Sequence, residues 1–263
     1  MNFNINFFKY RFIAFALSSF LIGLSAFLFL TKNLNLGIDF KGGIMIEAKF
    51  SDVPDLALLR DKIDNLQIGN SEIQEFGDSN TILFRLEKID DGNITQEEII
   101  QKLKNELDED TDYRRVEFVG PKVGKELKSI AIKAVLFSLV AMFIYIWFRF
   151  SGWQFCLGAL VALFHDVLST MGFFSLTQIE FNLASIAAIL TIAGYSINDT
   201  VVVFDRIREN LVKTDRELKE LLNVSINQTL SRTLMTSITT LLALLALFIF
   251  GSGFLDGNFV LVL

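Results

Sequence analysis

The sequence predicts a multi-span α-helical membrane protein with one α+β domain inserted after its first span. Three observations support this fold class. The 263-residue chain is 52% hydrophobic and contains several apolar runs. Those runs approach the roughly 20 residues that a helix needs to cross a bilayer. Most charged residues lie between Lys32 and Lys128, where strand-like and helix-like patterns alternate. We therefore expect three parts: residues 1–30 with the first span, 31–127 as the inserted domain, and 128–263 with the later spans.

The first apolar run, residues 12–30, is expected to stay in the protein as a membrane span. It is longer than the apolar part of a signal peptide, and it ends in FLFLTKN, which lacks a cleavage site with small residues. Lys9 and Arg11 precede the run, and positive charges mark the cytoplasmic end of a span. This places the N-terminus in the cytoplasm and makes the inserted domain extracytoplasmic.

The inserted domain is predicted to be a ferredoxin-like α+β sandwich. Four segments show strand patterns, and two have apolar positions at helical spacing. Thr95 and Glu98 are placed as a capping box at the start of the second helix. The resulting order β-α-β-β-α-β is that of a split βαβ fold. In chain order the segments are strand 42–50, helix 54–67, strands 72–77 and 81–87 joined by a turn at 77–80, helix 95–107, and strand 113–120.

The rest of the chain is predicted to hold four further spans and the start of another. The spans cover residues 130–148, 153–176, 181–204 and 229–250. Residues 205–228 mix basic and acidic side chains and look amphipathic, so we expect this segment to lie along the cytoplasmic membrane surface. After GSGFLDG, the apolar residues NFVLVL are too few to cross a bilayer, and we expect them to form an incomplete sixth helix.

Polar side chains inside the predicted spans mark the candidate functional site. An ionisable residue at the centre of a membrane helix costs about 2.5 to 3.5 kcal/mol on insertion scales, so Asp199 and Arg232 need a reason. Apolar surroundings disfavour a charged carboxylate, which suits Asp199 to binding and releasing protons. We expect Arg232 to pair with ionised Asp199 and to separate from it on protonation. The polar residues form one stripe per span: Asp166, Ser169 and Thr170 beside His165; Thr191, Tyr195 and Asp199 with Ser196 and Asn198; and Thr229, Arg232, Thr236 and Thr239 beside Gln228 and Thr240.

Structural explanations for these residues stay open at this point. Ser and Thr side chains readily form hydrogen bonds between membrane helices, so the stripes could hold the bundle together. Asp199 and Arg232 lie in the cytoplasmic halves of their spans and could simply reach interfacial water. For His165, a hydrogen bond to a backbone carbonyl is the favoured explanation.

Composition and motifs argue against several other classes of protein. A net charge of −6 argues against nucleic-acid binding. The single cysteine, Cys156, lies in an apolar run and is interpreted as a packing residue, so no disulfide framework or zinc motif is expected. The sequence contains no recognisable phosphate-binding loop, nucleophile with its base, or metal-ligand cluster. We therefore predict a protein that is not an enzyme and that needs no metal or cofactor.

Five sequence blocks resemble a known family. In order and spacing they resemble the signature blocks of the SecD/SecF family of bacterial protein-export membrane proteins, on its SecF side, over nearly the whole chain. The fourth block is the most specific, whereas a glycine pair beside a strand is common. The blocks are LGIDFKGG (36–43), VGPKVGKEL (119–127), FHDV (164–167), GYSINDTVVVFDRIREN (194–210) and NQTLSRTLMTSITTLLALLALFIFG (227–251).

The resemblance implies an RND-like bundle of six spans in the bacterial inner membrane, with an external domain after the first span. It further implies a subunit that pairs with SecD, associates with the SecYEG translocon, and uses the proton-motive force to move secreted polypeptides outward. YajC, YidC and membrane lipid are further candidate partners. Asp199 and Arg232 occupy positions implicated in proton conduction in this family, and we expect Asn198, Tyr195, Thr236 and Asp166 to support them.

Two other functions remain as alternatives. An RND-type pump for small molecules or lipids should have a large external porter domain and many more spans in one chain. An assembly scaffold, whose polar stripes only hold helices together, should tolerate charge-neutral replacement of Asp199.

Overall fold

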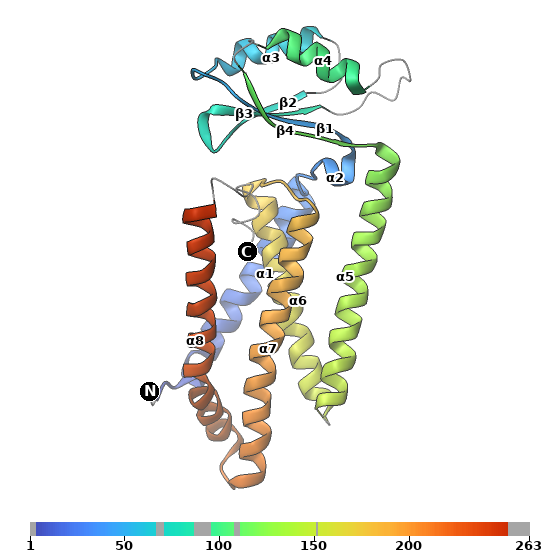
Figure 1. The fold of residues 1–263 in the computed structure, drawn as a ribbon. Coiled ribbons are helices and arrows are strands. Elements are labelled where there is room, and N and C mark those ends of the chain that lie inside the picture. The colour runs from blue at the N-terminus through green and yellow to red at the C-terminus, as the bar shows by residue number, and fades with distance from the viewer. Residues whose placement is uncertain (1–3, 67–70, 87–95, 108–110, 151, 252–263) are drawn as a thin grey trace. The chain divides into compact units, whose positions relative to one another are not determined.

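The chain divides into two compact units, and the structure describes residues 4–66, 71–86, 96–107, 111–150 and 152–251 of them. In this computed structural model one unit is Leu36–Ile132, and the other joins Met1–Asn35 to Lys133–Leu263. The first unit holds the α+β domain and the second holds long helices (Figure 1). The predicted fold class, a multi-span helical membrane protein with an inserted α+β domain, is confirmed.

The α+β unit has the predicted β-α-β-β-α-β order. Its strands form one sheet in the order β2-β3-β1-β4, and every neighbouring pair is antiparallel. Strands β1 and β2 are therefore parallel and separated by β3, which is the split βαβ arrangement. The elements are α2 (Ile38–Lys41), β1 (Gly43–Lys49), α3 (Leu56–Asn65), β2 (Ser71–Phe76), β3 (Asp78–Leu86), α4 (Gln96–Glu106) and β4 (Asp112–Val119).

The core of the α+β unit lies between the sheet and the two helices α3 and α4, which cover the same face (Figure 1). Alternate strand residues point into it because successive side chains of a strand face opposite sides. Asp55 caps the start of helix α3, and its carboxylate accepts a 2.8 Å hydrogen bond from the Ala57 N–H. The predicted capping box at Thr95 lies outside the described residues. Core residues include Ile44, Ile46 and Ala48 of β1, Ile82, Phe84 and Leu86 of β3, Leu59 and Ile63 of α3, and Ile99 and Leu103 of α4.

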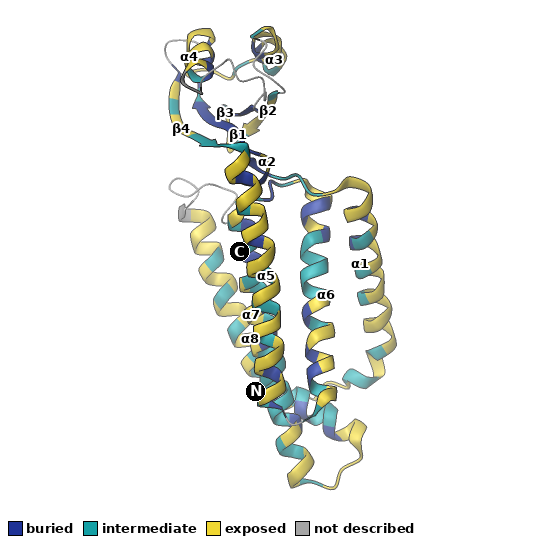
Figure 2. Ribbon diagram, turned by 90° about the vertical axis from the view of Figure 1, so that its right-hand side faces the viewer, coloured by how far each residue is buried: buried dark blue, intermediate teal, exposed yellow. Residues whose placement is uncertain are grey.

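Five described helices are long and apolar enough to cross a membrane, in agreement with the five predicted spans. Apolar side chains stand exposed along the outer faces of α5 and α8, as expected of surfaces that meet lipid or other membrane helices (Figure 2). The helices are α1 (Arg11–Lys32), preceded by the 3₁₀ turn η1 (Phe7–Tyr10), α5 (Pro121–Arg149), α6 (Trp153–Thr177), α7 (Leu183–Lys213) and α8 (Leu218–Gly251).

Close contacts fix the helices of the membrane unit against one another. A Cβ atom added at Gly172 of α6 would lie only 2.2 Å from the Ser25 Oγ of α1, so these two helices touch through small residues. At the other end of α6, the rings of Phe150, Phe155 and Phe204 meet with centroids 5.1 to 5.7 Å apart. This aromatic cluster joins Phe150, the residue after α5, to α6 and α7.

Helix α5 begins earlier than the sequence analysis expected. It starts at Pro121 rather than near residue 130, and the boundary between the units falls inside it, between Ile132 and Lys133. The reason is a glycine contact: a Cβ at Gly124 would lie 3.2 Å from the Gly42 backbone nitrogen, so the first turns of α5 pack against the α+β unit. Proline suits the first position of a helix, because its missing N–H would have no partner there.

Residues 205–228 are parts of α7 and α8 rather than an element of their own, and their place along the membrane surface stays a prediction. Residues up to Lys213 continue α7, residues 214–217 connect, and α8 starts at Leu218. The mixed charges of this segment favoured a separate element, but each long helix continues into it, and Ile207 of α7 and Leu221 of α8 are buried there. The residues expected to begin a sixth helix, 258–263, lie outside the described part of the chain.

Candidate functional site

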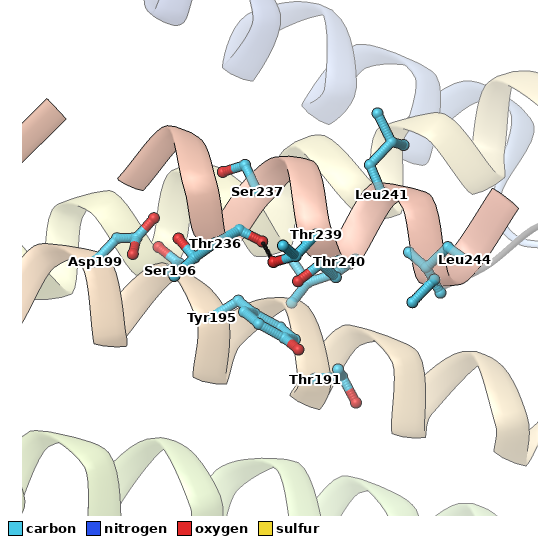
Figure 3. A pocket seen from close by; sticks show the side chains of 12 residues that line it. Thr191, Tyr195, Ser196, Asp199, Thr236, Ser237, Thr239, Thr240, Leu241 and Leu244 are labelled. Carbon is cyan, nitrogen blue, oxygen red and sulfur yellow. Dashed lines mark hydrogen bonds between the residues drawn. The ribbon is translucent and has the colours of Figure 1, made fainter. Parts of the chain in front are cut away.

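An open groove of about 770 Å³ lies between α7 and α8. Polar side chains dominate its α7 wall and the part of α8 opposite them, and apolar residues line the remainder. In Figure 3, Asp199 and Ser196 project from α7 toward Thr236 of α8, with Asp199 at one end of the row and Leu244 at the other. The lining residues are Thr191, Ile192, Tyr195, Ser196 and Asp199 of α7, and Thr236, Ser237, Thr239, Thr240, Leu241, Ala243 and Leu244 of α8.

The periodicity of α7 explains why its polar side chains share this groove. Thr191, Tyr195 and Asp199 are spaced by four residues, which puts them on one face of a helix. On another face, Ala193 and Ile197 are buried in an apolar cluster with residues of α5 and α6. That packing holds α7 with its polar stripe turned toward α8.

The groove hydroxyls do not tie the two helices together at this depth. Thr191 donates to the carbonyl oxygen of Ala187 at 2.9 Å, a bond within α7. Thr236 and Thr239 donate to carbonyl oxygens of α8 itself, at 2.8 to 3.0 Å. Among the described residues, no hydrogen bond in this groove joins α7 to α8. The threonine hydroxyls therefore donate to carbonyl oxygens of their own helices, and the groove stays open around Asp199.

Asp199 and Arg232 are not paired in this structure. Asp199 is half-buried in the groove wall, whereas Arg232 is exposed and outside the lining. No salt bridge among the described residues joins them. Arg232 lies one helical turn before Thr236, so the two residues stand on neighbouring helices at similar levels. Their pairing stays a prediction.

The other predicted site residues lie in three different places. Tyr195 and Thr236 line the groove with Asp199, but Asn198 is exposed beside it and does not line it. Asp166 lies on α6 and bonds to His165, with 2.9 Å between its Oδ1 and the imidazole Nδ1. Nδ1 of His165 thus meets a carboxylate rather than the expected backbone carbonyl.

Sequence reasoning missed a set of polar contacts at the ends of the helices. The Arg149 guanidinium, on the last residue of α5, forms a salt bridge with the Asp205 carboxylate of α7. Arg208 of α7 donates to the Arg149 carbonyl oxygen at 3.4 Å. Asn210 of α7 reaches α8, donating to Ser225 at 2.8 Å and to Gln228 at 3.0 Å. These contacts give a structural role to the charged half of the block at 194–210.

The chain before α1 is attached to the first turns of α8. The Asn227 amide accepts a hydrogen bond from the Ile5 N–H and donates one to the Ile5 carbonyl oxygen, both at 2.8 Å. Asn223 accepts from the Phe7 N–H at 2.8 Å. In the sequence these two asparagines are four residues apart, which places them on one face of α8.

The close approach of Gly42 to Pro121 explains why the blocks at 36–43 and 119–127 occur together. Gly42 has a φ of +77°, a conformation that glycine adopts at little cost. A Cβ there would lie 2.9 Å from the Pro121 Cα, closer than real Cβ contacts. The backbone after α2 and the start of α5 can therefore touch only if Gly42 has no side chain.

Together, these features define a class: a multi-span membrane protein with an ionisable side chain in a polar groove of its helix bundle and an α+β domain after its first span. Residues 99–263 match the family model described as protein export membrane protein SecD/SecF, C-terminal. Residues 27–52 match the SecD/SecF GG motif, which contains Gly42. The chain belongs to the SecD/SecF family of protein-export membrane proteins.

Individual relatives agree with this assignment. The chain is 45% identical over 248 residues to the protein translocase subunit SecF of Rickettsia bellii, covering 93% of this chain and 82% of the relative. It is 46% identical over 256 residues to the same subunit of Calditerrivibrio nitroreducens, covering 94% and 83%. The crystal structure of SecDF from Thermus thermophilus, a translocon-associated membrane protein, matches with a TM-score of 0.86 at 35% identity. That match covers 99% of this chain but only 36% of the SecDF chain.

Proposed function

We propose that this chain acts with a SecD partner to promote the translocation of secreted polypeptides, driven by the proton-motive force. The observation that carries the proposal is the position of Asp199: an ionisable side chain within a membrane-spanning helix, in a polar groove, in a chain of a protein-export family. Such residues in membrane helices commonly mark ion or proton pathways. No covalent catalysis is part of the proposal.

The energy available to such a site is sufficient for a conformational switch. One elementary charge that crosses the membrane gains about 2.3 kcal/mol per 100 mV. By population-shift arithmetic this changes a two-state equilibrium by well over tenfold. A proton that enters the groove and neutralises Asp199 changes the charge between α7 and α8, and with it the preferred spacing of these helices.

The groove also supports a partner in the membrane. Tyr195 in the groove wall is 51% exposed, and Leu241 in the opposite wall is 62% exposed. Polar groups at this depth need protein or a water-filled cavity around them rather than lipid tails. The matched SecDF chain is much longer than this one. We propose that helices of SecD cover the groove, that the complex docks on SecYEG, and that YajC and YidC are further candidate partners.

The same proposal fixes the orientation in the bacterial inner membrane. Lys9 and Arg11 support a cytoplasmic N-terminus, and Arg149, Arg206 and Arg208 would then lie toward the cytoplasmic side as well. The α+β domain is then extracytoplasmic, where emerging polypeptides arrive. Labelling of cysteines engineered into β4 from the outer side of the membrane tests this orientation; labelling only from the cytoplasmic side contradicts it.

The decisive experiment replaces Asp199 by Asn in the assembled export complex. Preprotein translocation is measured with an imposed proton gradient and after the gradient is collapsed. Asn keeps the shape and hydrogen bonding of Asp but cannot titrate, so we expect the gradient to lose its effect while unstimulated export persists. Thr191→Val, which changes a groove hydroxyl that bonds only within α7, is the matched control and should keep the stimulation. Full stimulation in a correctly inserted Asp199→Asn protein would mean a non-conducting scaffold.

Arg232 is tested as the partner charge. We expect Arg232→Met to resemble Asp199→Asn, and Arg232→Lys to rescue in part because lysine lacks the planar guanidinium. A double-mutant cycle then measures the interaction. Strictly additive effects on gradient-driven export show that the two side chains act independently.

A further inference from the structure

A second pair of titratable groups lies on α6, outside the groove lining. His165 Nδ1 and Asp166 Oδ1 are 2.9 Å apart, and both side chains are largely covered, at 26% and 34% exposed. The sequence contains one histidine, so this imidazole is unique in the chain. The proposed function assigns no role to this histidine.

The chemistry of the pair fixes which ring nitrogen carries hydrogen. An ionised carboxylate accepts hydrogen bonds and cannot donate them, so Nδ1 must be the donor to Asp166. In the neutral imidazole this leaves Nε2 with a lone pair, able to accept a proton. Protonation of Nε2 gives an imidazolium ion whose charge is balanced by the Asp166 carboxylate. The pair therefore has the arrangement of a proton acceptor with its own counter-ion.

The surroundings of Nε2 point to the same role. Nε2 is buried and has no hydrogen-bond partner among the described residues, and the same holds for Ser169 Oγ. His165 and Ser169 are four residues apart and share a helix face. Two unpartnered polar atoms on one face of a membrane helix are costly for packing alone. A hydroxyl, which both donates and accepts, is also a suitable neighbour for a nitrogen that gains and loses a proton.

Helix α1 supplies a further hydroxyl at this level. Ser25 of α1 meets Gly172 of α6, and the two helices run in the same direction (Figure 1). Ser18 and His165 each precede that contact by seven residues, which is close to two helical turns. Equal spacing along neighbouring helices places Ser18 at the depth of His165, on the half-buried side of α1.

Among the described residues, no salt bridge joins His165 or Asp166 to a third charged group. Helix α1 has no titratable residue between Arg11 and Lys32. On α7 the nearby titratable residues are Tyr195 and Asp199, which line the groove toward α8. On α5, Tyr145 is 52% exposed, and Arg149 at its end is bound to Asp205.

We propose that His165 and Asp166 form a second proton-binding site, in which Asp166 fixes the Nδ1–H tautomer and Nε2 takes up the proton. The site is separate from Asp199 and binds its proton independently of Asp199. Proton binding at this site does not depend on the proposed function, but its use in gradient-driven export rests on that function.

Nitrogen NMR of the single histidine tests the proposal directly. The full chain is labelled with ¹⁵N-histidine, purified with a histidine-free tag, and placed in lipid nanodiscs. We expect one neutral tautomer, with hydrogen on Nδ1, at alkaline pH, and reversible protonation of Nε2 between about pH 5 and 8, the range in which histidine changes charge. Asp199→Asn should show the same titration, because the sites are separate. Asp166→Asn should give a mixture of tautomers, because an amide can donate or accept.

The opposing outcomes are equally clear. An Nε2–H tautomer, or an imidazole that does not titrate in this range, overturns the proposal, and a tautomer unchanged in Asp166→Asn removes the role of Asp166. A second measurement covers variants that fold poorly: the pH profile of gradient-driven export. His165→Asn should change the profile, whereas Thr170→Val should not, because the Thr170 hydroxyl bonds only to the backbone of its own helix. An unchanged profile in His165→Asn alongside a normal titration shows that the site binds protons but has no part in export, which overturns its functional half.

Discussion

Replacing Gly42, the residue directly before β1, by alanine introduces two energetic costs that glycine avoids. The first cost is backbone strain, because Gly42 has a φ of +77°. The second is the close approach of backbone, because the new Cβ would lie 2.9 Å from Pro121 Cα. Pro121 Cα cannot rotate away as a side chain does, so the start of α5 must shift.

Gly77, in the turn between β2 and β3, is a matched control for the first cost. Its φ is +70°, and a Cβ there would meet no atom within 4 Å. Left-handed backbone costs an L-residue roughly 1–2 kcal/mol, so Gly77→Ala should lose about that much. Gly42→Ala should lose the same amount plus roughly 1–3 kcal/mol for overpacking. Gly120→Ala, whose Cβ would only meet the Phe118 ring at 3.8 Å, should change stability little.

The assay is chemical and thermal unfolding of the fragment Leu36–Ile132, which has its own core and includes the start of α5. For a domain of roughly 100 residues, 1 kcal/mol corresponds to about 4–8 °C in Tm. The Gly42→Ala fragment should therefore melt well below the Gly77→Ala fragment. If the two variants lose equal stability, the close approach of Gly42 and Pro121 costs nothing, and the explanation of the two glycine blocks is wrong.

Three further predictions concern other contacts. Gly172→Ala should destabilise the helix bundle by roughly 1–3 kcal/mol in nanodiscs, because the new Cβ would lie 2.7 Å from Ser25 Cα, whereas Gly23→Ala should be nearly neutral because no atom lies within 4 Å; equal effects contradict the packing. Asn227→Ala should speed amide exchange at Ile5 without affecting Phe7 to the same degree, because it removes both bonds to Ile5; unchanged protection at Ile5 would show that the tether is absent in solution. Burial raises the pKa of Tyr113, so its contribution to the stability of the fragment Leu36–Ile132 should be complete below about pH 10 and be lost as pH rises through the folded-state pKa. Tyr113 is the only tyrosine in the fragment, so tyrosinate absorbance reports its ionisation directly. Tyr113→Phe should remove this loss of stability, and an identical pH profile in the variant would contradict the prediction.

The parts of the fold that could be predicted are those that local periodicity encodes. Alternation over residues 42–50 and 81–87 reflects one buried sheet face, and each apolar run long enough for a bilayer became a helix. The stripe of Thr191, Tyr195 and Asp199 could be predicted for the same reason, since spacing by four fixes a helix face.

The parts that could not be predicted depend on contacts between distant residues. Asn227 binds Ile5 across 222 positions of sequence, and Arg149 binds Asp205 across 56. The spacing of residues within one helix carries no information about a partner so far away in the sequence. The start of α5 was predicted too late because its first turns are polar, and their contact with Gly42 depends on the fold of the inserted domain. The relation of Asp199 to Arg232 was inferred from charge alone, and no salt bridge joins them among the described residues.

Helix α5 is the element through which a proton at Asp199 could act on the α+β domain. Its first turns pack against Gly42, and it continues as one helix across the boundary at Ile132. Its last residue, Arg149, is bound to Asp205 of α7, the helix that carries Asp199. We expect a shift of α7 on protonation to reach α5 through this salt bridge and to pass along the continuous helix.

Breaking α5 at that boundary tests this route of coupling. Ile132 is 53% exposed, so its side chain adds little packing. Proline there removes a backbone hydrogen bond and kinks the helix at a cost of about 3 kcal/mol, yet membrane helices tolerate such breaks. We expect Ile132→Pro to insert normally and to export without stimulation by a proton gradient, whereas Ile132→Ala, which keeps the helix continuous, should retain the stimulation. The Asp199 site is left unchanged in both variants. If Ile132→Pro responds fully to the gradient, α5 does not transmit the switch, even where Asp199 binds protons.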